Sequence, residues 1–191
     1  MQLQRSARSR YGGTVSLTDD LLAEGEPEVE FHDGVASRMP RKRIAAGAII
    51  RDHDGRILMV EPLYKPTWDI PGGVVDANES PLDGCRREIT EELGLDLPLP
   101  RLLVIDWVPQ QGVWHDALLF VFDGGTVTPE QVAGLTLQRD ELTSIRFATL
   151  DEIASHVRPS ALRRLQASVE ILEAGAPTPA YLQFGRPALM G

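Results

Sequence analysis

The stretch GVVDANESPLDGCRREITEELGL, residues 73–95, decides how the rest of the chain is interpreted. Its glutamates Glu88, Glu91 and Glu92 are spaced i, i+3 and i+4, which places them on one face of a helix. Like charges at this spacing repel one another, whereas a cation bound between them would reverse the penalty. Mg²⁺ is often held by carboxylates together with substrate phosphates. The pattern therefore suggests a metal-carrying helix for phosphate chemistry, and the alternative is a solvated face of good helix formers.

The sequence marks both ends of this helix. Ser80 suits the N-cap, Pro81 suits the first helical position, and Gly94 is a C-terminal stop. The strongly apolar positions at helical spacing are Leu82, Ile89 and Leu93. They predict a narrow buried stripe, so the glutamates lie beside it and next to the Gly72-Gly73 turn.

Composition and charge restrict the function. The 191 residues suit one domain with appendages. A net charge of −9 makes the chain a poor nucleic-acid binder, because such binding needs Lys and Arg against phosphates. The one cysteine, Cys85, cannot form an internal disulfide, which favours a cytoplasmic location. No apolar run approaches the ~20 residues of a membrane span, and the N-terminus lacks the apolar run of a secretory signal.

The chain divides into three parts by composition. Residues 1–40 form an N-terminal extension that begins with a basic tail and carries a short helix at 16–23 and the start of a strand at 29–31. Residues 41–175 form the compact domain. Residues 176–191 are rich in Pro and Gly and are expected to form an extended tail, open to ordering by a neighbouring subunit.

Within the compact domain, strands and helices alternate irregularly. Strands are expected at residues 43–51, 56–61, 101–108, 113–123, 135–138 and 144–148, with an Asp-Gly turn at 54–55 joining the first two. One helix is expected to begin at the capping box of residues 149–152, and the amphipathic stripe of residues 161–174 predicts another. The order predicts an α/β fold in which helices cover both sides of a mixed sheet.

The stretch also resembles a known motif. Gly73, Glu79, Arg87-Glu88-Ile89, Glu91-Glu92 and Gly94-Leu95 occupy every fixed position of the Nudix hydrolase box. The box covers about an eighth of the chain, since it takes 23 of 191 residues. The resemblance implies the α/β/α sandwich of that family over residues 43–157, with the Nudix domain spanning 41–175.

The resemblance implies roles for the box residues. Glu88, Glu91, Glu92 and the carbonyl of Gly73 would hold Mg²⁺ or Mn²⁺. Arg87 would orient the glutamates through charge-assisted hydrogen bonds.

Two further carboxylates complete this set. Glu79 would support Arg87 as a structural partner. The proton of the attacking water would pass to a box glutamate or to a carboxylate from a later loop. Glu141 is the choice for that later carboxylate, and the alternative is a solvated loop acid.

The reaction implied is hydrolysis of the pyrophosphate in a nucleoside diphosphate linked to another moiety. ADP-ribose or a nucleotide sugar is preferred, because N-terminal segments build a homodimer in ADP-ribose-type relatives. The alternatives are house-cleaning of a nucleoside triphosphate and a non-catalytic ligand sensor.

Candidate substrate contacts come from aromatic and basic residues. Trp68 is the preferred partner for a nucleobase, because it precedes the Pro71-Gly72-Gly73 turn. Tyr64, Trp107 and Trp114 are the other aromatic candidates, with core or hairpin packing as the alternative for each. Arg51 is a candidate phosphate contact, as are Lys65 and Arg101.

Overall fold

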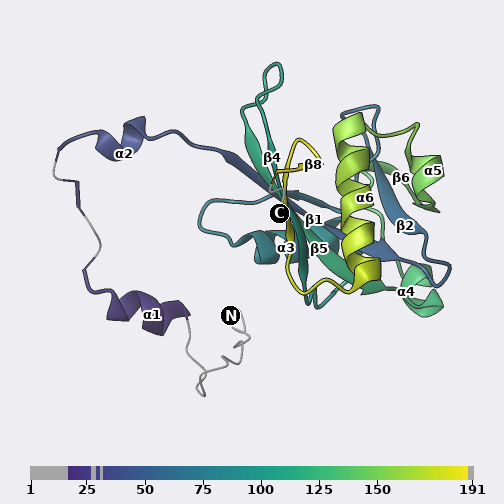
Figure 1. The fold of residues 1–191 in the computed structure, drawn as a ribbon. Helices are drawn as coiled ribbons and strands as arrows, with labels where there is room; N and C mark the ends of the chain where they lie inside the picture. Colours follow the sequence, from purple (N-terminus) through teal and green to yellow (C-terminus); the bar gives the residue numbers. More distant parts are fainter. Residues whose placement is uncertain (1–16, 27–28, 31, 189–191) are drawn as a thin grey trace. The chain divides into compact units, whose positions relative to one another are not determined.

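The computed structural model describes residues 17–26, 29–30 and 32–188 (Figure 1). The chain forms two compact units, Met1–Arg41 and Lys42–Gly191. None of the described helices is both long enough and apolar enough to cross a membrane.

The first unit contains two short helices, α1 (Leu17–Ala23) and α2 (Val35–Arg38). The first confirms the helix expected at 16–23 over the described residues. The Glu30 carboxylate accepts hydrogen bonds from the Gly34 and Ala36 amides at 2.7 and 2.6 Å, which fixes the start of α2. The strand expected to start at 29–31 is wrong at Val29 and Glu30, which are irregular, while residue 31 lies outside the described part. Residues 1–16, which include the basic tail, also lie outside it.

The second unit is built on one mixed sheet. Its strands are β1 (Arg43–Arg51), β2 (Ile57–Pro62), β3 (Gly72–Val74), β4 (Leu102–Val108), β5 (Ala117–Thr126), β6 (Leu142–Ala148), β7 (Ala180–Gln183) and β8 (Arg186–Pro187). The order is β6-β2-β1-β5-β4-β7-β8. The short strand β3 lies outside this order and pairs with β1. β1 runs parallel to β5 and antiparallel to β2 and β3.

This topology gathers several loops at one end of the sheet. Arg43 at the start of β1 lies opposite Ala117 at the start of β5. Pro62 at the end of β2 lies opposite Leu142 at the start of β6. The connection from Val108 to Ala117 turns at the same end. Residues far apart in the sequence therefore meet there.

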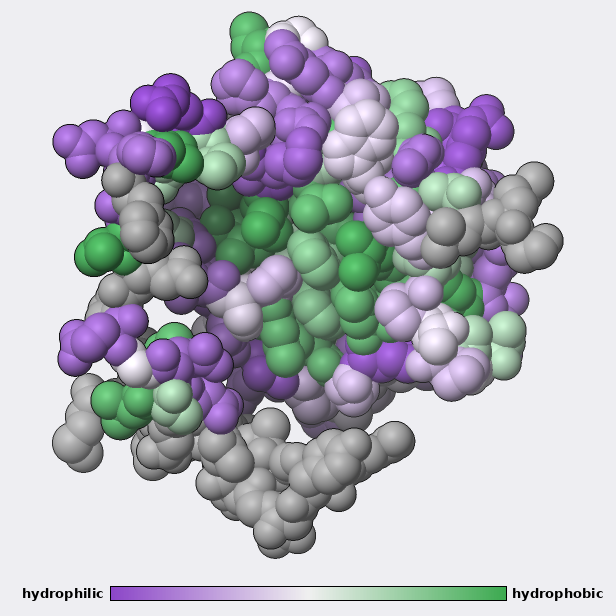
Figure 2. Space-filling view, turned by 60° about the vertical axis from the view of Figure 1, so that its left-hand side comes forward, coloured by the Kyte–Doolittle hydropathy of each residue, from purple (hydrophilic) through white to green (hydrophobic). Residues whose placement is uncertain are grey.

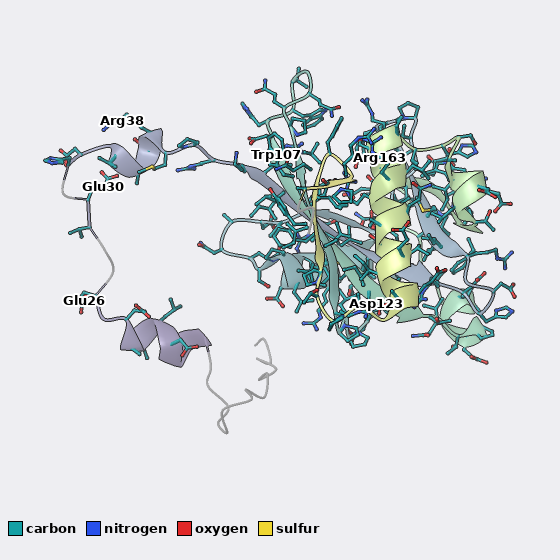
Figure 3. All side chains as sticks on the ribbon, in the orientation of Figure 1. Glu26, Glu30, Arg38, Trp107, Asp123 and Arg163 are labelled. Carbon is teal, nitrogen blue, oxygen red and sulfur yellow. The ribbon has the colours of Figure 1, made fainter. Side chains whose placement is uncertain are left out.

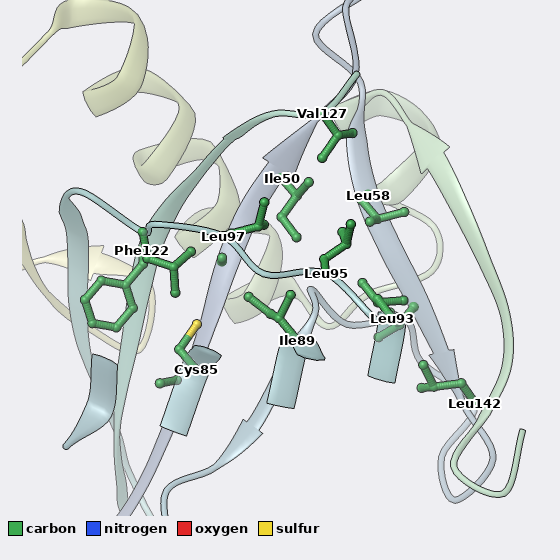
Figure 4. Packing of buried hydrophobic residues seen from close by; sticks show 14 residues of the cluster. Ile50, Leu58, Cys85, Ile89, Leu93, Leu95, Leu97, Phe122, Val127 and Leu142 are labelled. Atoms are coloured by element: carbon green, nitrogen blue, oxygen red, sulfur yellow. The ribbon is translucent and has the colours of Figure 1, made fainter. Parts of the chain in front are cut away.

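Helices cover both faces of the sheet, and Figure 1 shows α6 (Pro159–Ala174) crossing one of them. Alternate residues of β1 face opposite layers: Ile50 packs with Ile89 of α3 (Pro81–Leu93), and Ile49 packs with Leu165 of α6. Figure 4 shows the α3 layer, where Cys85, Ile89 and Leu93 lie among strand residues. Two short helices complete the unit, α4 (Pro129–Ala133) and α5 (Leu150–Ile153). The predicted sandwich with a mixed sheet is confirmed.

Hydrophobic residues are not confined to the interior. Figure 2 shows them gathered in the middle of one face of the structure and bordered by hydrophilic residues.

The extended tail expected at 176–191 is corrected over its described residues. β7 adds a parallel strand to β4, so this segment belongs to the sheet. The contact is fixed by the fully buried Asp106, whose carboxylate accepts a hydrogen bond from Arg164 Nε at 2.8 Å. The Gly185 amide donates to the same carboxylate at 3.0 Å. A buried carboxylate needs such partners, so the β7–β8 turn is bound firmly to the domain.

Candidate functional site

The helix α3 presents its carboxylates at unequal depth. Ser80 Oγ accepts the Asp83 amide at 3.1 Å, and Gly94 ends the helix at φ 69°, as the sequence predicts. Glu92 is only 5 % exposed, and the Glu88 side chain is 17 % exposed. Glu91 is 53 % exposed. The single glutamate face is therefore divided into an inward pair at i, i+4 and one outward residue.

The glycine turn allows the inward carboxylates to lie against the backbone of β3. Gly72 has φ 138°, and a Cβ there would meet the Ala46 carbonyl oxygen at 2.2 Å. A Cβ on Gly73 would lie 2.4 Å from Glu88 Cδ. The Gly72 amide donates to Glu92 Oε2 at 2.9 Å. Glycine is required at both positions by this close approach.

Arg87 holds three carboxylates together. Its Nε and Nη2 donate to the two oxygens of Glu79 at 2.9 and 3.0 Å, which is the pairing that the resemblance implies. Its Nη1 donates to Glu88 Oε1 at 2.9 Å and to Glu91 Oε2 at 3.0 Å. The hydrogen bonds from Arg87 hold the pKa of Glu79 below its usual range. The same carboxylates raise the pKa of Arg87.

Glu141 reaches the site through the loop that precedes β6. The strand expected at 135–138 is wrong, because this segment binds the end of α3 instead: the Thr136 and Gln138 amides donate to the Leu93 and Glu92 carbonyls at 3.0 and 3.1 Å. These are carbonyls that a helix leaves without an internal partner. The loop is thereby held beside the glutamates.

These elements surround a cavity of about 380 Å³ at the gathered end of the sheet. Its charged lining residues are Arg43, Lys65, Asp69, Glu88, Glu92 and Glu141. Gly72, Gly73 and Tyr64 also line it, whereas Glu91 does not. The structure thus brings together Gly73, Glu88, Glu92 and Glu141 from the predicted set.

Burial sets the ionisation of the inward pair. It raises the pKa of Glu92 to about 8, with the charges of Glu88, Asp69 and Glu141 adding to the effect. Burial also raises the pKa of Glu88, although Arg87 opposes the rise. The pKa of Lys65 is also raised, which favours its charged form. Burial opposes this charge, but the Asp69 carboxylate at 2.6 Å outweighs the effect of burial. The cavity thus disfavours carboxylate charge until a cation is bound.

The donor chemistry of this site fits a hard divalent cation. Glu88 and Glu92 offer carboxylate oxygens beside the backbone of Gly73, and such oxygens are the ligands that Mg²⁺ prefers. Within the described ranges, no three His, Cys, Asp or Glu side chains form a complete ligand set.

Trp68, the preferred partner for a nucleobase, lies in the core and is not part of the cavity lining. The residue is 7 % exposed, and its ring stacks on His156 with centroids 3.7 Å apart. The Arg146 guanidinium carbon lies 4.4 Å from the same ring. The preference for Trp68 is corrected, because its ring packs against His156 and Arg146, which lie 88 and 78 positions later in the sequence.

Arg51 is also placed away from the cavity. It ends β1, whereas Arg43 begins it, so the two are separated by about 27 Å at the usual rise of a strand. Arg51 pairs instead with Asp123 at 3.7 Å. Figure 3 shows Asp123 at the end of the unit opposite Trp107, whose indole binds the hairpin residue Asp116. The substrate contact expected at Arg51 is therefore corrected.

Arg43 and Asp69 are charged cavity residues that the sequence alone does not identify as site residues. The sequence predicts Arg43 as the first residue of the strand at 43–51, and the pairing of that strand with β3 brings it to the cavity. Lys65, a candidate phosphate contact by residue type, lines the same cavity.

Comparisons with known proteins agree with this geometry. The model of the NUDIX domain matches residues 41–168. A "MutT-like protein" from Streptomyces ambofaciens is 29 % identical over 112 residues, which are 59 % of this chain and 66 % of that protein. The "Putative ADP-ribose pyrophosphatase YjhB" of Bacillus subtilis (strain 168) is 29 % identical over 103 residues, 51 % of this chain and 49 % of that protein. The chain thus spans between half and two thirds of the length of these relatives.

A solved structure shows the same fold. The MutT protein from Methanosarcina mazei Go1 aligns with a TM-score of 0.55 and 24 % identity, covering 72 % of this chain and 99 % of that one. Because the family model covers most of the chain and includes the glutamate helix, the glycine turn and the cavity between them, this chain belongs to the Nudix family.

Proposed function

We propose that this chain hydrolyses the pyrophosphate bond of a nucleoside diphosphate linked to another moiety, giving a nucleoside monophosphate and a phosphorylated product. The observation that carries the proposal is the cavity, where Arg43 and Lys65 stand with the carboxylates of Glu88, Glu92 and Glu141. Cations suit the phosphate oxygens, and carboxylates suit a metal and the attacking water. A site for an uncharged ligand would not need this combination.

Glu88, Glu91, Glu92 and the Gly73 carbonyl would hold Mg²⁺ or Mn²⁺, and Arg87 binds only one oxygen of Glu91. When bound, the cation neutralises phosphate charge and lowers the pKa of a coordinated water. Arg87 would orient Glu88 and Glu91, and Glu79 would hold Arg87 in place.

Arg43 and Lys65 would bind the diphosphate. Lys65 is restrained by Asp69, and Arg43 by the His115 carbonyl at 3.3 Å, so both cations are held before a substrate arrives. Such preorganisation lowers the entropy that binding costs.

Glu141 is proposed as the proton acceptor. It lines the cavity near the inward glutamates and is held there by the Leu63 amide, which donates to its carbonyl at 2.8 Å. A box glutamate is the alternative acceptor, and Glu141→Gln separates the two. If Glu141 takes the proton, this variant retains metal binding and loses the rise of kcat with pH.

ADP-ribose or a nucleotide sugar is the preferred substrate class. The Bacillus subtilis relative, whose name refers to ADP-ribose, supports this preference. A cavity of about 380 Å³ is within the usual range for small-molecule sites. The alternative is a nucleoside triphosphate pyrophosphohydrolase. A non-catalytic sensor is disfavoured, because every box carboxylate is retained.

The deciding experiment is a substrate panel with product identification in Mg²⁺ and in Mn²⁺. ADP-ribose and nucleotide sugars should give a nucleoside monophosphate and a sugar phosphate. Release of pyrophosphate from nucleoside triphosphates would favour the alternative. The double variant Glu91→Gln/Glu92→Gln should lose hydrolysis while remaining folded. No cleavage of any nucleotide would overturn the proposal and favour the sensor.

We also propose that residues 1–40 mediate a homodimer. Leu21 and Leu22 of α1 are 62 % and 74 % exposed within their unit, so this helix has apolar side chains available for a partner. Light scattering on the full chain and on Leu21→Ser/Leu22→Ser tests this. A full chain that is monomeric at high concentration would contradict it.

A further inference from the structure

Tyr64 occupies an unusual place for an aromatic residue. It is 76 % exposed, so the core does not need its ring. It nevertheless lines the cavity, and no other aromatic residue in the described part of the chain does so. The ring therefore stands at the cavity without a packing role.

The backbone around Tyr64 is held on both sides. The preceding amide, of Leu63, donates to the Glu141 carbonyl at 2.8 Å. The following residue, Lys65, is bound to Asp69 and has its Nζ 5.5 Å from the centre of the Tyr64 ring. In the sequence, Tyr64 thus lies between a residue bound to the Glu141 loop and a cation of the cavity.

We propose that Tyr64 is the platform on which the nucleobase of the substrate stacks. The inference rests on the proposed function, because it assumes a ligand with a base joined to a diphosphate. Lys65 next to the ring would bind the diphosphate, so the adjacent residues Tyr64 and Lys65 would contact the base and the diphosphate of one nucleotide. Stacking uses the π face that every base has, and the tyrosine ring supplies an exposed face for it.

Trp114 is the competing aromatic residue. It is 59 % exposed in the β4–β5 hairpin, but the Arg43 guanidinium carbon lies 5.1 Å from its ring centre. It does not line the cavity itself. Its contact with Arg43 gives it a role in holding that cation, and this favours Tyr64 for the base.

The test measures binding of three probes in Mg²⁺ by calorimetry, two with a nucleobase and one without. The non-hydrolysable α,β-methylene-ADP and α,β-methylene-UDP carry a base, whereas methylenediphosphonate carries the diphosphate mimic alone. Tyr64→Ala is expected to weaken binding of the nucleotide probes about 5- to 100-fold, the range for loss of one stacked base. Binding of methylenediphosphonate should be unchanged, and Tyr64→Phe should bind like the wild type.

Tyr181→Ala is the matched control, since it removes a tyrosine of β7 that is 37 % exposed and does not line the cavity. Its affinity for every probe should equal that of the wild type. The inference is overturned if Tyr64→Ala binds the nucleotide probes as the wild type does, or if Trp114→Ala shows the larger loss. It is also overturned if the wild type does not prefer a nucleotide probe to methylenediphosphonate.

The binding assay and the hydrolysis panel can refute the two proposals independently of each other. A chain that cleaves no nucleotide, yet loses base-dependent binding in Tyr64→Ala, retains the subsite and refutes the hydrolase. A chain that cleaves nucleotides with the same KM in Tyr64→Ala retains the hydrolase and refutes the subsite.

Discussion

Replacing Glu92 by glutamine is expected to stabilise the metal-free protein while weakening its binding of a divalent cation. Burial raises the pKa of Glu92 to about 8 from a usual 4.5, so the folded carboxyl holds its proton more tightly than the unfolded one. The free energy of unfolding of the metal-free wild type should therefore fall as the pH rises from about 4.5 to about 8 and level off above that. Glutamine is neutral throughout and keeps an oxygen for the Gly72 amide.

The size of the effect follows from the pKa difference. At about 1.4 kcal/mol per pKa unit, it corresponds to an upper bound of about 5 kcal/mol. A gain above about 2 kcal/mol at pH 9 is expected for Glu92→Gln, which is about 4 to 8 °C in Tm for a chain of this length. Near pH 4.5 the two proteins should be almost equally stable.

The assay is urea unfolding in EDTA between pH 4.5 and 9, repeated in Mg²⁺. Added Mg²⁺ should stabilise the wild type, because binding favours the ionised carboxylate, and should stabilise Glu92→Gln much less. In EDTA, Glu91→Gln is the matched control for burial, since Glu91 lies on the same helix and its side chain is 53 % exposed. Wild-type stability that does not fall with pH, or a Glu92→Gln variant no more stable than the wild type at pH 9, would refute the reasoning.

Three other substitutions have definite expected results. Arg87→Ala removes the hydrogen bonds that orient Glu88 and Glu91 and should lower Mg²⁺ affinity about 10- to 100-fold by calorimetry; unchanged or higher affinity would show that Arg87 does not orient the ligands. Gly72→Ala forces a side chain against the Ala46 carbonyl at a positive φ and should cost about 3 kcal/mol or more in urea unfolding. Arg164→Ala leaves the Asp106 carboxylate buried without its ion pair and should cost about 3–5 kcal/mol; a loss below 1 kcal/mol would mean that other groups satisfy Asp106.

The sequence predicted best what is determined locally. The bounds of α3 follow from Ser80 and Gly94, which act on backbone groups within one turn of themselves. The close approach at the glycine turn was expected from residue type alone. These features need no knowledge of which strands pair.

The features that the sequence did not predict depend on contacts between distant residues. Trp68 carries no local sign that His156 will cover its ring. Arg51 and Arg43 are the two ends of one strand, and only the pairing of β1 with β3 shows which end faces the cavity. The segment that becomes β7 is short and bounded by Pro and Gly, so its pattern is typical of a tail, and its partner β4 lies over 70 residues earlier.

The late position of β7 has a consequence for synthesis on the ribosome. β4 is left with an unpaired edge until residues 180–183 have emerged and paired with it. Exposed strand edges are sites where chains pair with one another. At ordinary elongation rates of about 5–20 residues per second, the stretch from β4 to β7 takes several seconds to appear. During that interval the nascent chain is open to aggregation, and a trigger-factor-like chaperone or slow expression should raise the yield of folded protein.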